Sequence, residues 1–289
     1  MLKARINSNI LTACIQPLLS YIKKNSSGNL HSPEKYIELG FYRSYITMRI
    51  HTKGYTHIIR SVTLDHASWV EEKQVVCVRA TNLVEMIQAL PKNTYINTTT
   101  EMFNLTFDTG ITTQLEDGTW WDGRLYRLLE GRLPQDPELQ DQPIYEQEVS
   151  TVSVDKVALS EAIDTIDSTQ GTWRTKIGMT VSSKDDVHTL TLSTYDGDLN
   201  ISLNARVIHT RDCYNINNHC LCGKFYNVLV ESETLRVVKH LLPKDEYVIV
   251  QLIADNKETL EPSAVYFITR STTICANTYM LGAQNANEI

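Results

Sequence analysis

The sequence lacks the features that indicate a membrane protein or a common class of enzyme. No run of about 18 apolar residues is present, so no transmembrane helix is predicted. Residues 1–7 contain no hydrophobic segment of the kind found in signal peptides. We also find no Gly-x-Gly-x-x-Gly motif, no phosphate-binding loop, no His-Glu-x-x-His and no Gly-x-Ser-x-Gly. These absences favour a cytoplasmic protein that is not an enzyme and needs no cofactor.

Positive charge is also scarce in this chain. Lys and Arg number 27 against 34 Asp and Glu, which gives a net charge of −7. A protein that coats nucleic acid with its whole surface is normally basic. If nucleic acid is the partner, the basic contact must therefore be local.

The six cysteines do not form a recognisable metal-binding pattern. The nearest approach to a zinc set is Cys213, His219, Cys220 and Cys222. Its Cys-x-Cys pair lacks the two-residue spacer common in structural zinc sites, so we predict no metal there. The cysteines that lie within apolar stretches are Cys14, Cys77 and Cys275. We expect these three to be buried, reduced thiols.

One pattern occurs twice in the chain. Residues 83–95 and 235–247 are both apolar helical stretches that end in Leu-Pro-Lys, with a Tyr three residues after the Lys. The two segments lie 152 residues apart, counted from 83 to 235. Solenoid repeats are much shorter, and 289 residues are enough for two domains. The repeat therefore predicts two copies of one domain.

Further landmarks recur in the same order at slowly changing offsets. Apolar residues at helical spacing occur near the N-terminus and again after residue 150: Leu11, Ile15 and Leu18, then Leu159, Ile163 and Ile166. Turns between alternating apolar runs follow at Lys53-Gly54 and at Asp196-Gly197. Duplication with small insertions explains this order. The alternative is a chance similarity between common helix–hairpin patterns.

Each half of the chain reads as helix, hairpin, strand, helix and further strands. The predicted helices cover 9–23, with an interruption at Pro17, and 81–90, 155–167 and 232–242. The strands predicted in the second half lie near 175–183, 188–194, 199–208, 223–230, 247–254, 264–270 and 272–280. Residues 133–145 contain three prolines and three acids, which is typical of an extended connector. We therefore divide the chain into domain 1 at 1–135, a connector at 136–149 and domain 2 at 150–289.

This organisation resembles the DNA sliding clamps, the ring-shaped processivity factors of DNA polymerases. Short motifs are similar to those of the bacterial type. Thr194-Tyr195-Asp196-Gly197 resembles the family's Ala-Thr-Asp-Gly hairpin, and 128–136 resembles its domain ending, with Leu133 in place of Phe. The segments 78–91 and 173–179 are similar to two of the family's strand and helix junctions. The resemblance covers nearly the whole chain.

The resemblance implies an α+β fold of tandem duplicated clamp domains, each with two helices packed on a curved antiparallel sheet. Bacterial clamps carry three such domains and dimerise, whereas the family's two-domain members form trimeric rings. A ring-forming homotrimer is therefore expected, encircling double-stranded DNA and tethering a DNA polymerase. An alternative is a clamp-fold scaffold or inhibitor that no longer encircles DNA. A third hypothesis is a nucleic-acid-modifying enzyme whose site carries no known motif.

In this family helices line the central hole, so their outward basic residues are expected to face phosphate. The candidate DNA-binding residues are Lys23, Lys24, Lys92, Arg174, Lys176, Arg236, Lys239 and Lys244. Basic residues at helix ends also complement the helix dipole without binding anything. The predicted helix 155–167 argues against the simple hypothesis, because it carries four acids: Asp155, Glu161, Asp164 and Asp167. These acids are the main support for the scaffold alternative.

The resemblance also implies that the polymerase and the clamp loader insert short peptides into one apolar pocket. The residues that match its walls are Tyr195, Leu199, Val230 and Leu235. Three apolar residues of the acidic connector are expected to form a lid: Leu139, Ile144 and Tyr145. Scattered exposed apolar side chains are common, which is the alternative explanation for the lid residues.

Overall fold

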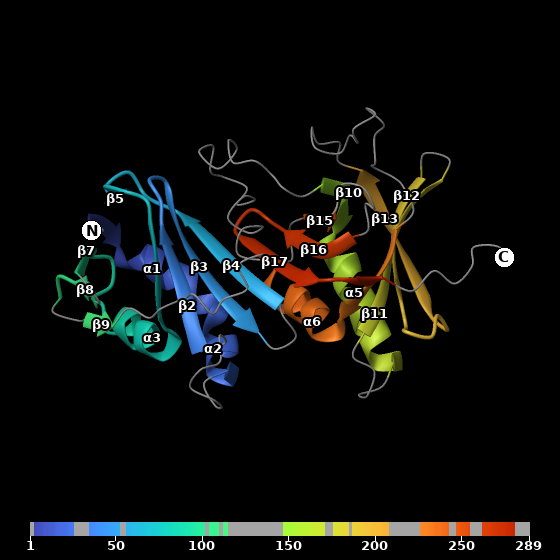
Figure 1. Cartoon of the computed structure of the whole chain (residues 1–289), viewed down its shortest axis with the longest axis horizontal. Coiled ribbons are helices and arrows are strands. Elements are labelled where there is room, and N and C mark those ends of the chain that lie inside the picture. Colours follow the sequence, from blue (N-terminus) through green and yellow to red (C-terminus); the bar gives the residue numbers. More distant parts are fainter. Residues whose placement is uncertain are drawn as a thin grey trace. The chain divides into compact units, whose positions relative to one another are not determined.

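The chain folds as two units in the computed structural model (Figure 1). One unit comprises residues 1–53 and 57–127, and the other comprises 54–56 and 128–289. The structure describes residues 3–25, 35–52, 56–101, 104–109, 112–114, 147–170, 176–184, 187–207, 226–242, 247–254 and 262–280. Among these residues, no helix is long and apolar enough to cross a membrane.

The helices of the first unit begin and end close to the predicted positions. The N-terminal helical segment consists of α1 (Ser8–Ile15), a 3₁₀ turn η1 (Gln16–Leu18) and α2 (Leu19–Asn25). Pro17 lies at the start of the 3₁₀ turn, because its ring cannot be accommodated within an α-helix without breaking the hydrogen-bond ladder. The second helix, α3 (Ala80–Gln88), contacts α1. The interruption predicted at Pro17 is therefore confirmed.

The strands of the first unit form two antiparallel groups. Their bounds are β1 Lys3–Asn7, β2 Tyr36–Phe41, β3 Tyr45–Thr52, β4 Thr56–Thr63, β5 Trp69–Val70, β6 Gln74–Arg79, β7 Tyr95–Glu101, β8 Asn104–Phe107 and β9 Thr112–Gln114. One group has the order β5-β1-β7-β8-β9, and the other has the order β4-β3-β2-β6. Buried apolar side chains of both groups and of the helices, such as Ile6, Leu11 and Leu39, form the core.

The second unit contains two helices and nine strands among its described residues. The helices are α5 (Lys156–Gln170) and α6 (Ser232–Leu241), which contact each other (Figure 1). The strands are β10 Gln147–Asp155, β11 Lys176–Lys184, β12 Val187–Ser193, β13 Asn200–Val207, β14 Tyr226–Glu231, β15 Tyr247–Ala254, β16 Pro262–Ile268, β17 Thr272–Asn277 and β18 Tyr279–Met280. Within this unit they follow the order β18-β14-β11-β12-β13-β10-β15-β16-β17.

Strand pairing follows the same scheme in both units. The strand before the first helix pairs with the strand after the second helix, as β1 with β7 and β10 with β15. The hairpins β2–β3 and β11–β12 correspond, and so do the pairs β2–β6 and β11–β14. The ladders β7–β8–β9 and β15–β16–β17 complete the correspondence. The tandem duplication inferred from the sequence is therefore present in the fold.

The strand register is also the same in both units at the residue that precedes the first helix. Tyr95 is paired with Asn7, and Tyr247 is paired with Asp155. Asn7 and Asp155 both precede a helix, and each accepts a hydrogen bond from a backbone N–H of the first turn, at 3.0 and 2.9 Å. In each unit the helix therefore ends shortly before the Leu of the repeated Leu-Pro-Lys-x-x-Tyr motif, and the Tyr of the motif occupies the same strand position.

The hairpin at Thr194–Gly197 has the turn expected from its sequence. Gly197 adopts a φ of 77°, a left-handed conformation that glycine tolerates without steric cost. The Gly197 N–H donates to the Thr194 carbonyl at 2.9 Å, and the Leu199 N–H donates to the Thr194 hydroxyl at 3.1 Å. This turn joins β12 to β13 and leaves Tyr195 at the surface.

The cysteines differ from expectation at one position. Cys14 and Cys275 are buried free thiols, as predicted, but Cys77 is only half-buried. Cys77 lies on β6, on the same face of the strand as Val75 and Arg79. These two residues are also half-buried, so this face of β6 is partly exposed to solvent. Burial raises the pKa of Cys14 to about 12, so this thiol stays protonated and unreactive at neutral pH.

Candidate nucleic-acid interface

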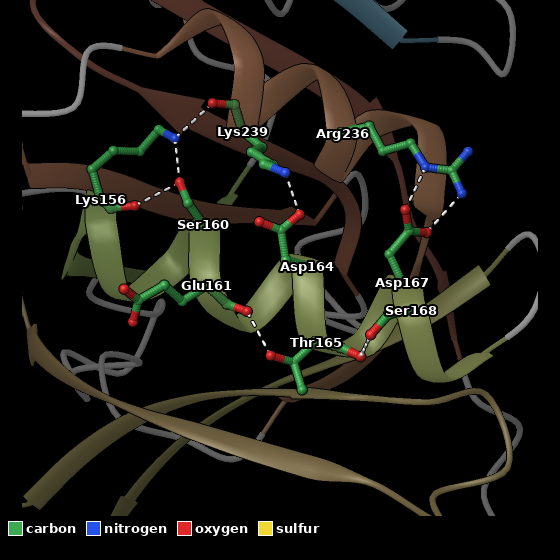
Figure 2. A network of polar contacts seen from close by, with 9 residues as sticks. All are labelled: Lys156, Ser160, Glu161, Asp164, Thr165, Asp167, Ser168, Arg236 and Lys239. Atoms are coloured by element: carbon green, nitrogen blue, oxygen red, sulfur yellow. Dashed lines mark hydrogen bonds and ion pairs between the residues drawn. The ribbon is translucent and has the colours of Figure 1, made fainter.

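Two of the predicted DNA-binding residues lie together on one helix, and the others lie elsewhere. Arg236 and Lys239 are one turn apart on α6, and both side chains face α5 (Figure 2). Lys23 is exposed on α2, Lys92 is exposed in the turn after α3, and Lys176 is half-buried on β11. Arg174 and Lys244 lie outside the described residues, and for Lys24 only the helical backbone is described.

Arg236 is held by a carboxylate of the neighbouring helix. Its Nε donates to Oδ2 of Asp167 at 2.8 Å, and its Nη2 donates to Oδ1 of the same residue at 2.6 Å (Figure 2). Glu233 lies one turn away on α6, with its Oε2 3.5 Å from Nη1 of Arg236. The hydrogen bonds to Asp167 are the largest cause that raises the pKa of Arg236 above its ordinary value, and the charges of Asp167 and Glu233 add to it, so the guanidinium remains charged.

Lys239 forms the second link between the two helices. Its ammonium donates to Oδ1 of Asp164 on α5 (Figure 2). Asp164 and Asp167 are three residues apart, as are Arg236 and Lys239, so the two pairs lie one helical turn apart on facing surfaces. Both cations of α6 that we predicted to face DNA therefore have a carboxylate partner within the protein.

A buried lysine also connects the two helices. Lys156, at the first position of α5, has only 1% of its surface exposed. Its Nζ donates to the Ser160 hydroxyl at 2.6 Å and to the backbone carbonyl of Lys239 at 2.9 Å (Figure 2). The last carbonyls of a helix have no partner within the helix and carry partial negative charge, which a cation stabilises. Lys156 therefore caps the C-terminal end of α6.

The acids of α5 thus have different roles. Asp155 caps the start of the helix, while Asp164 and Asp167 bind the cations of α6. Glu161 is exposed, and its carboxylate points away from α6 (Figure 2). The sequence had left open where this acidic helix faces, and the structure directs two of its four acids at α6.

The corresponding helices of the first unit carry little charge. Among the residues of α1 and α3, Glu85 alone is charged. The exposed positions of these two helices are mostly small or uncharged polar residues: Asn9, Thr12, Ala13, Thr81, Asn82 and Gln88. The lysines of these helical segments are at the segment ends, with Lys23 and Lys24 on α2 and Lys92 in the turn after α3. Neither helix pair is therefore a strongly basic surface.

The predicted peptide-pocket residues fall into two groups in the structure. Tyr195 is 53% exposed and Leu199 is half-buried, at the two ends of the β12–β13 turn. Val230 on β14 and Leu235 on α6 are fully buried in the core of the second unit. Leu139, Ile144 and Tyr145 lie outside the described residues. The surface near Tyr195 thus remains the accessible part of the predicted pocket.

Sequence reasoning missed the link between α5 and α6. The signal was the matched three-residue spacing of two acids on one predicted helix and two bases on the other. The candidate zinc residues Cys213, His219, Cys220 and Cys222 lie outside the described residues. Within the described part of the chain, no group of three metal-ligating side chains comes together.

Solved structures similar to this chain are bacterial sliding clamps. The DNA polymerase III subunit beta of Pseudomonas aeruginosa aligns at a TM-score of 0.61 and 14% identity, over 96% of this chain and 64% of that one. The Bacillus subtilis DNA polymerase sliding clamp aligns at 0.60 and 12%, over 96% and 64%. The Helicobacter pylori beta clamp, solved with a DNA ligase peptide, aligns at 0.58 and 12%, over 96% and 66%.

No protein-family model matches the sequence, and a search of curated protein sequences finds no relative. The similarity therefore lies in the fold, at identities too low to carry a function across. The chain spans about two thirds of the length of these clamps, 64% for the first two and 66% for the third. Nearly the whole chain, 96%, takes part in each alignment, so this protein has the fold of the bacterial beta clamp.

Proposed function

We propose that this protein is a subunit of a DNA sliding clamp that encircles duplex DNA and tethers a DNA polymerase in the cytoplasm. The observation that carries the proposal is the beta-clamp fold, built here as two units with one strand-pairing scheme. Such a clamp acts as a scaffold rather than as an enzyme.

The oligomer follows from the number of units in the chain. The clamps that this protein resembles close rings of six domains, and this chain contributes two, so three chains complete a ring. Head-to-tail contacts around a closed ring leave no sheet edge unpaired. We therefore propose a homotrimer.

Partner binding is proposed by analogy with the clamps of similar fold. The Helicobacter pylori clamp was solved with a DNA ligase peptide and a Pseudomonas aeruginosa clamp with griselimycin. A polymerase and a clamp loader would bind this protein through short peptides in the same manner. The surface beside Tyr195 and Leu199 is accessible to such a peptide.

Two measurements on the purified chain test the proposal. Light scattering is expected to give about 99 kDa, three times the chain mass of 32.9 kDa. After addition of its loader, the protein is expected to remain on nicked circular plasmid through a gel-filtration column. It should be lost when the plasmid is cut, because a ring slides off a free end. A stable monomer at micromolar concentration, or equal retention on circular and cut DNA, would contradict encirclement.

A second candidate function is a clamp-fold scaffold or inhibitor that does not encircle DNA. The observation that favours it is the pairing of Arg236 and Lys239 with carboxylates of α5. The plasmid experiment separates the two functions, because a scaffold of this kind would not be retained on the circle. Binding of a polymerase peptide without retention would support the scaffold.

A further inference from the structure

The ion pairs between α5 and α6 occupy the groups that would otherwise bind phosphate. Asp167 places its two oxygens on the Nε and Nη2 edge of Arg236, at 2.8 and 2.6 Å. A planar guanidinium binds a carboxylate or a phosphate through this same two-point arrangement. Asp164 binds the ammonium of Lys239 as a phosphate oxygen would. Each carboxylate therefore stands where an external anion would have to bind.

These pairs lie at the surface, where an external polyanion could reach them. The side chains are 43% exposed for Arg236, 31% for Asp167, 29% for Lys239 and 58% for Asp164. Glu233 is a third carboxylate on this surface, and it is the second one that pairs with Arg236. The remaining cation, Lys156, is buried and directed at the Lys239 carbonyl and Ser160, so its charge does not reach the surface.

We propose that the α5–α6 face is a charge-compensated surface, on which Asp164 and Asp167 compete with DNA phosphate for Lys239 and Arg236. Through this competition the two helices contribute almost no attraction to the duplex. A clamp that must move along DNA benefits, because firm phosphate contacts would slow sliding. The inference rests on the proposed function for the identity of the polyanion, but the competition itself can be measured without ring loading.

The test uses Asp164→Asn, Asp167→Asn and the double variant of the full chain. Each is titrated with a linear 30-base-pair duplex between 50 and 200 mM NaCl, followed by fluorescence anisotropy. Each released cation should steepen the dependence of log K on log salt by about one. That corresponds to about a fourfold larger loss of affinity across this salt range for each cation. Asp167→Asn should give the smaller change, because Glu233 still binds Arg236.

Glu161→Gln is the matched control, because it removes one negative charge from the same helix. Its carboxylate points away from α6, and only its backbone carbonyl takes part in the network of Figure 2. This variant should leave the salt slope unchanged. If it steepens the slope as much as Asp164→Asn does, net charge rather than competition explains the effect and the proposal is wrong.

Removal of the cations gives a second, independent arm. Arg236→Ala with Lys239→Ala should leave the slope of the native protein unchanged, and should abolish the gain in the double-Asn background. If removing both cations from the native protein instead made the dependence of log K on log salt shallower by about two, the proposal would be overturned, because the cations would then already bind phosphate. Thermal melting of every variant confirms that it is folded.

The outcomes separate the inference from the proposed function. A steeper slope in the Asn variants, with wild-type protein that is not retained on nicked circles, supports the competition and contradicts encirclement. Retention of wild-type protein with an unchanged slope in the folded Asn variants supports encirclement and overturns the competition.

Discussion

Lys156 shows how one residue can connect two helices. Its ammonium is removed from water, which is unfavourable unless hydrogen bonds replace the lost hydration. The Lys239 carbonyl at 2.9 Å and the Ser160 hydroxyl at 2.6 Å provide that replacement. Ser160 in turn donates to the Lys156 carbonyl at 2.9 Å, so its hydroxyl has a partner even without the ammonium.

We therefore expect Lys156→Met to lower the free energy of unfolding by about 1–3 kcal/mol, because the Lys239 carbonyl then loses its donor at a partly buried position. Methionine keeps most of the side-chain volume, so loss of packing contributes little. Val157→Ala is the control, since Val157 is 49% exposed and its truncation should change stability by about 0.5 kcal/mol or less. Urea unfolding followed by circular dichroism measures both. Equal stability of the Lys156→Met variant and the wild type would argue against the capping role.

Asp65 is a residue whose protonation should affect stability. The pKa of Asp65 lies below 3.8, and the largest cause is the hydrogen bond from the Ser68 side chain. Hydrogen bonds from the Tyr95 hydroxyl and from two backbone N–H groups lower this pKa further, while desolvation raises it. Its Oδ1 accepts from the Ser68 N–H at 2.8 Å, and its Oδ2 accepts from the Tyr95 hydroxyl at 3.1 Å.

Because the folded pKa of Asp65 is depressed, the native state binds fewer protons than the unfolded state at acidic pH. The stability from Asp65 is therefore fully present above pH 3.8 and is lost as pH falls through the folded pKa. We expect the stability difference between wild type and Asp65→Asn to shrink over that window. Tyr95→Phe should weaken this pH dependence but not abolish it, because the Ser68 bonds remain. A difference that stays constant down to pH 2 would contradict the prediction.

At the level of elements, close approach between neighbouring strands depends on glycine in both units. Gly40 on β2 is paired with Thr47 on β3, and Gly178 on β11 is paired with Ser193 on β12. A Cβ at Gly40 would lie 2.4 Å from the Thr47 hydroxyl and 2.6 Å from the Tyr42 ring. A Cβ at Gly178 would lie 2.2 Å from the Ser193 hydroxyl.

We expect Gly40→Ala to destabilise the protein by about 1–3 kcal/mol, because the Tyr42 ring cannot easily move. That ring is stacked on Tyr45, with centroids 4.5 Å apart.

Gly178→Ala should have a smaller effect, since a serine hydroxyl can rotate away. Adding Ser193→Ala to Gly178→Ala should recover most of the loss, because the Ser193 Cβ lies 3.6 Å from the added methyl position, an ordinary contact. Chemical denaturation measures the stability of Gly40→Ala, of Gly178→Ala and of the double variant. If the double variant is no more stable than Gly178→Ala, a clash with the Ser193 hydroxyl is excluded as the cause.

At the level of the whole molecule, a partner peptide needs an accessible apolar surface. Tyr195 and Leu199 provide one at the β12–β13 turn, whereas Val230 and Leu235 are buried. A charged substitution at Leu235 would disrupt the core, so it could not distinguish lost docking from unfolding.

We expect Tyr195→Ala with Leu199→Ala to weaken binding of a polymerase-derived peptide by about tenfold or more, because anchoring contacts carry most of the energy of such interfaces. The mass in solution and the melting temperature should stay close to those of the native protein, since Tyr195 is exposed. Isothermal titration calorimetry gives the affinity, with Arg206→Ala on the exposed face of β13 as the control. Native affinity in the Tyr195 and Leu199 variant would locate the peptide site elsewhere.

The sequence alone determined the elements and their repetition. Apolar spacing predicted α3, α5 and α6, Pro17 predicted the break between α1 and α2, and the repeated Leu-Pro-Lys-x-x-Tyr motif predicted the duplication. These features are local, because helix periodicity, proline geometry and turn glycines act within a few residues. The matching register of Tyr95 and Tyr247 follows from the same short motif.

Only the tertiary structure decided which side chains meet. Lys156 stands at the start of α5 and is buried against the end of α6, a contact that no local sequence pattern indicates. Arg236 and Lys239 read as free cations, yet Asp167 and Asp164 of another helix bind them. The partners are separated by 69 to 83 residues in the chain. Their contact depends on how α5 and α6 rotate as they pack on the sheet, and that rotation is set by the whole core rather than by either helix.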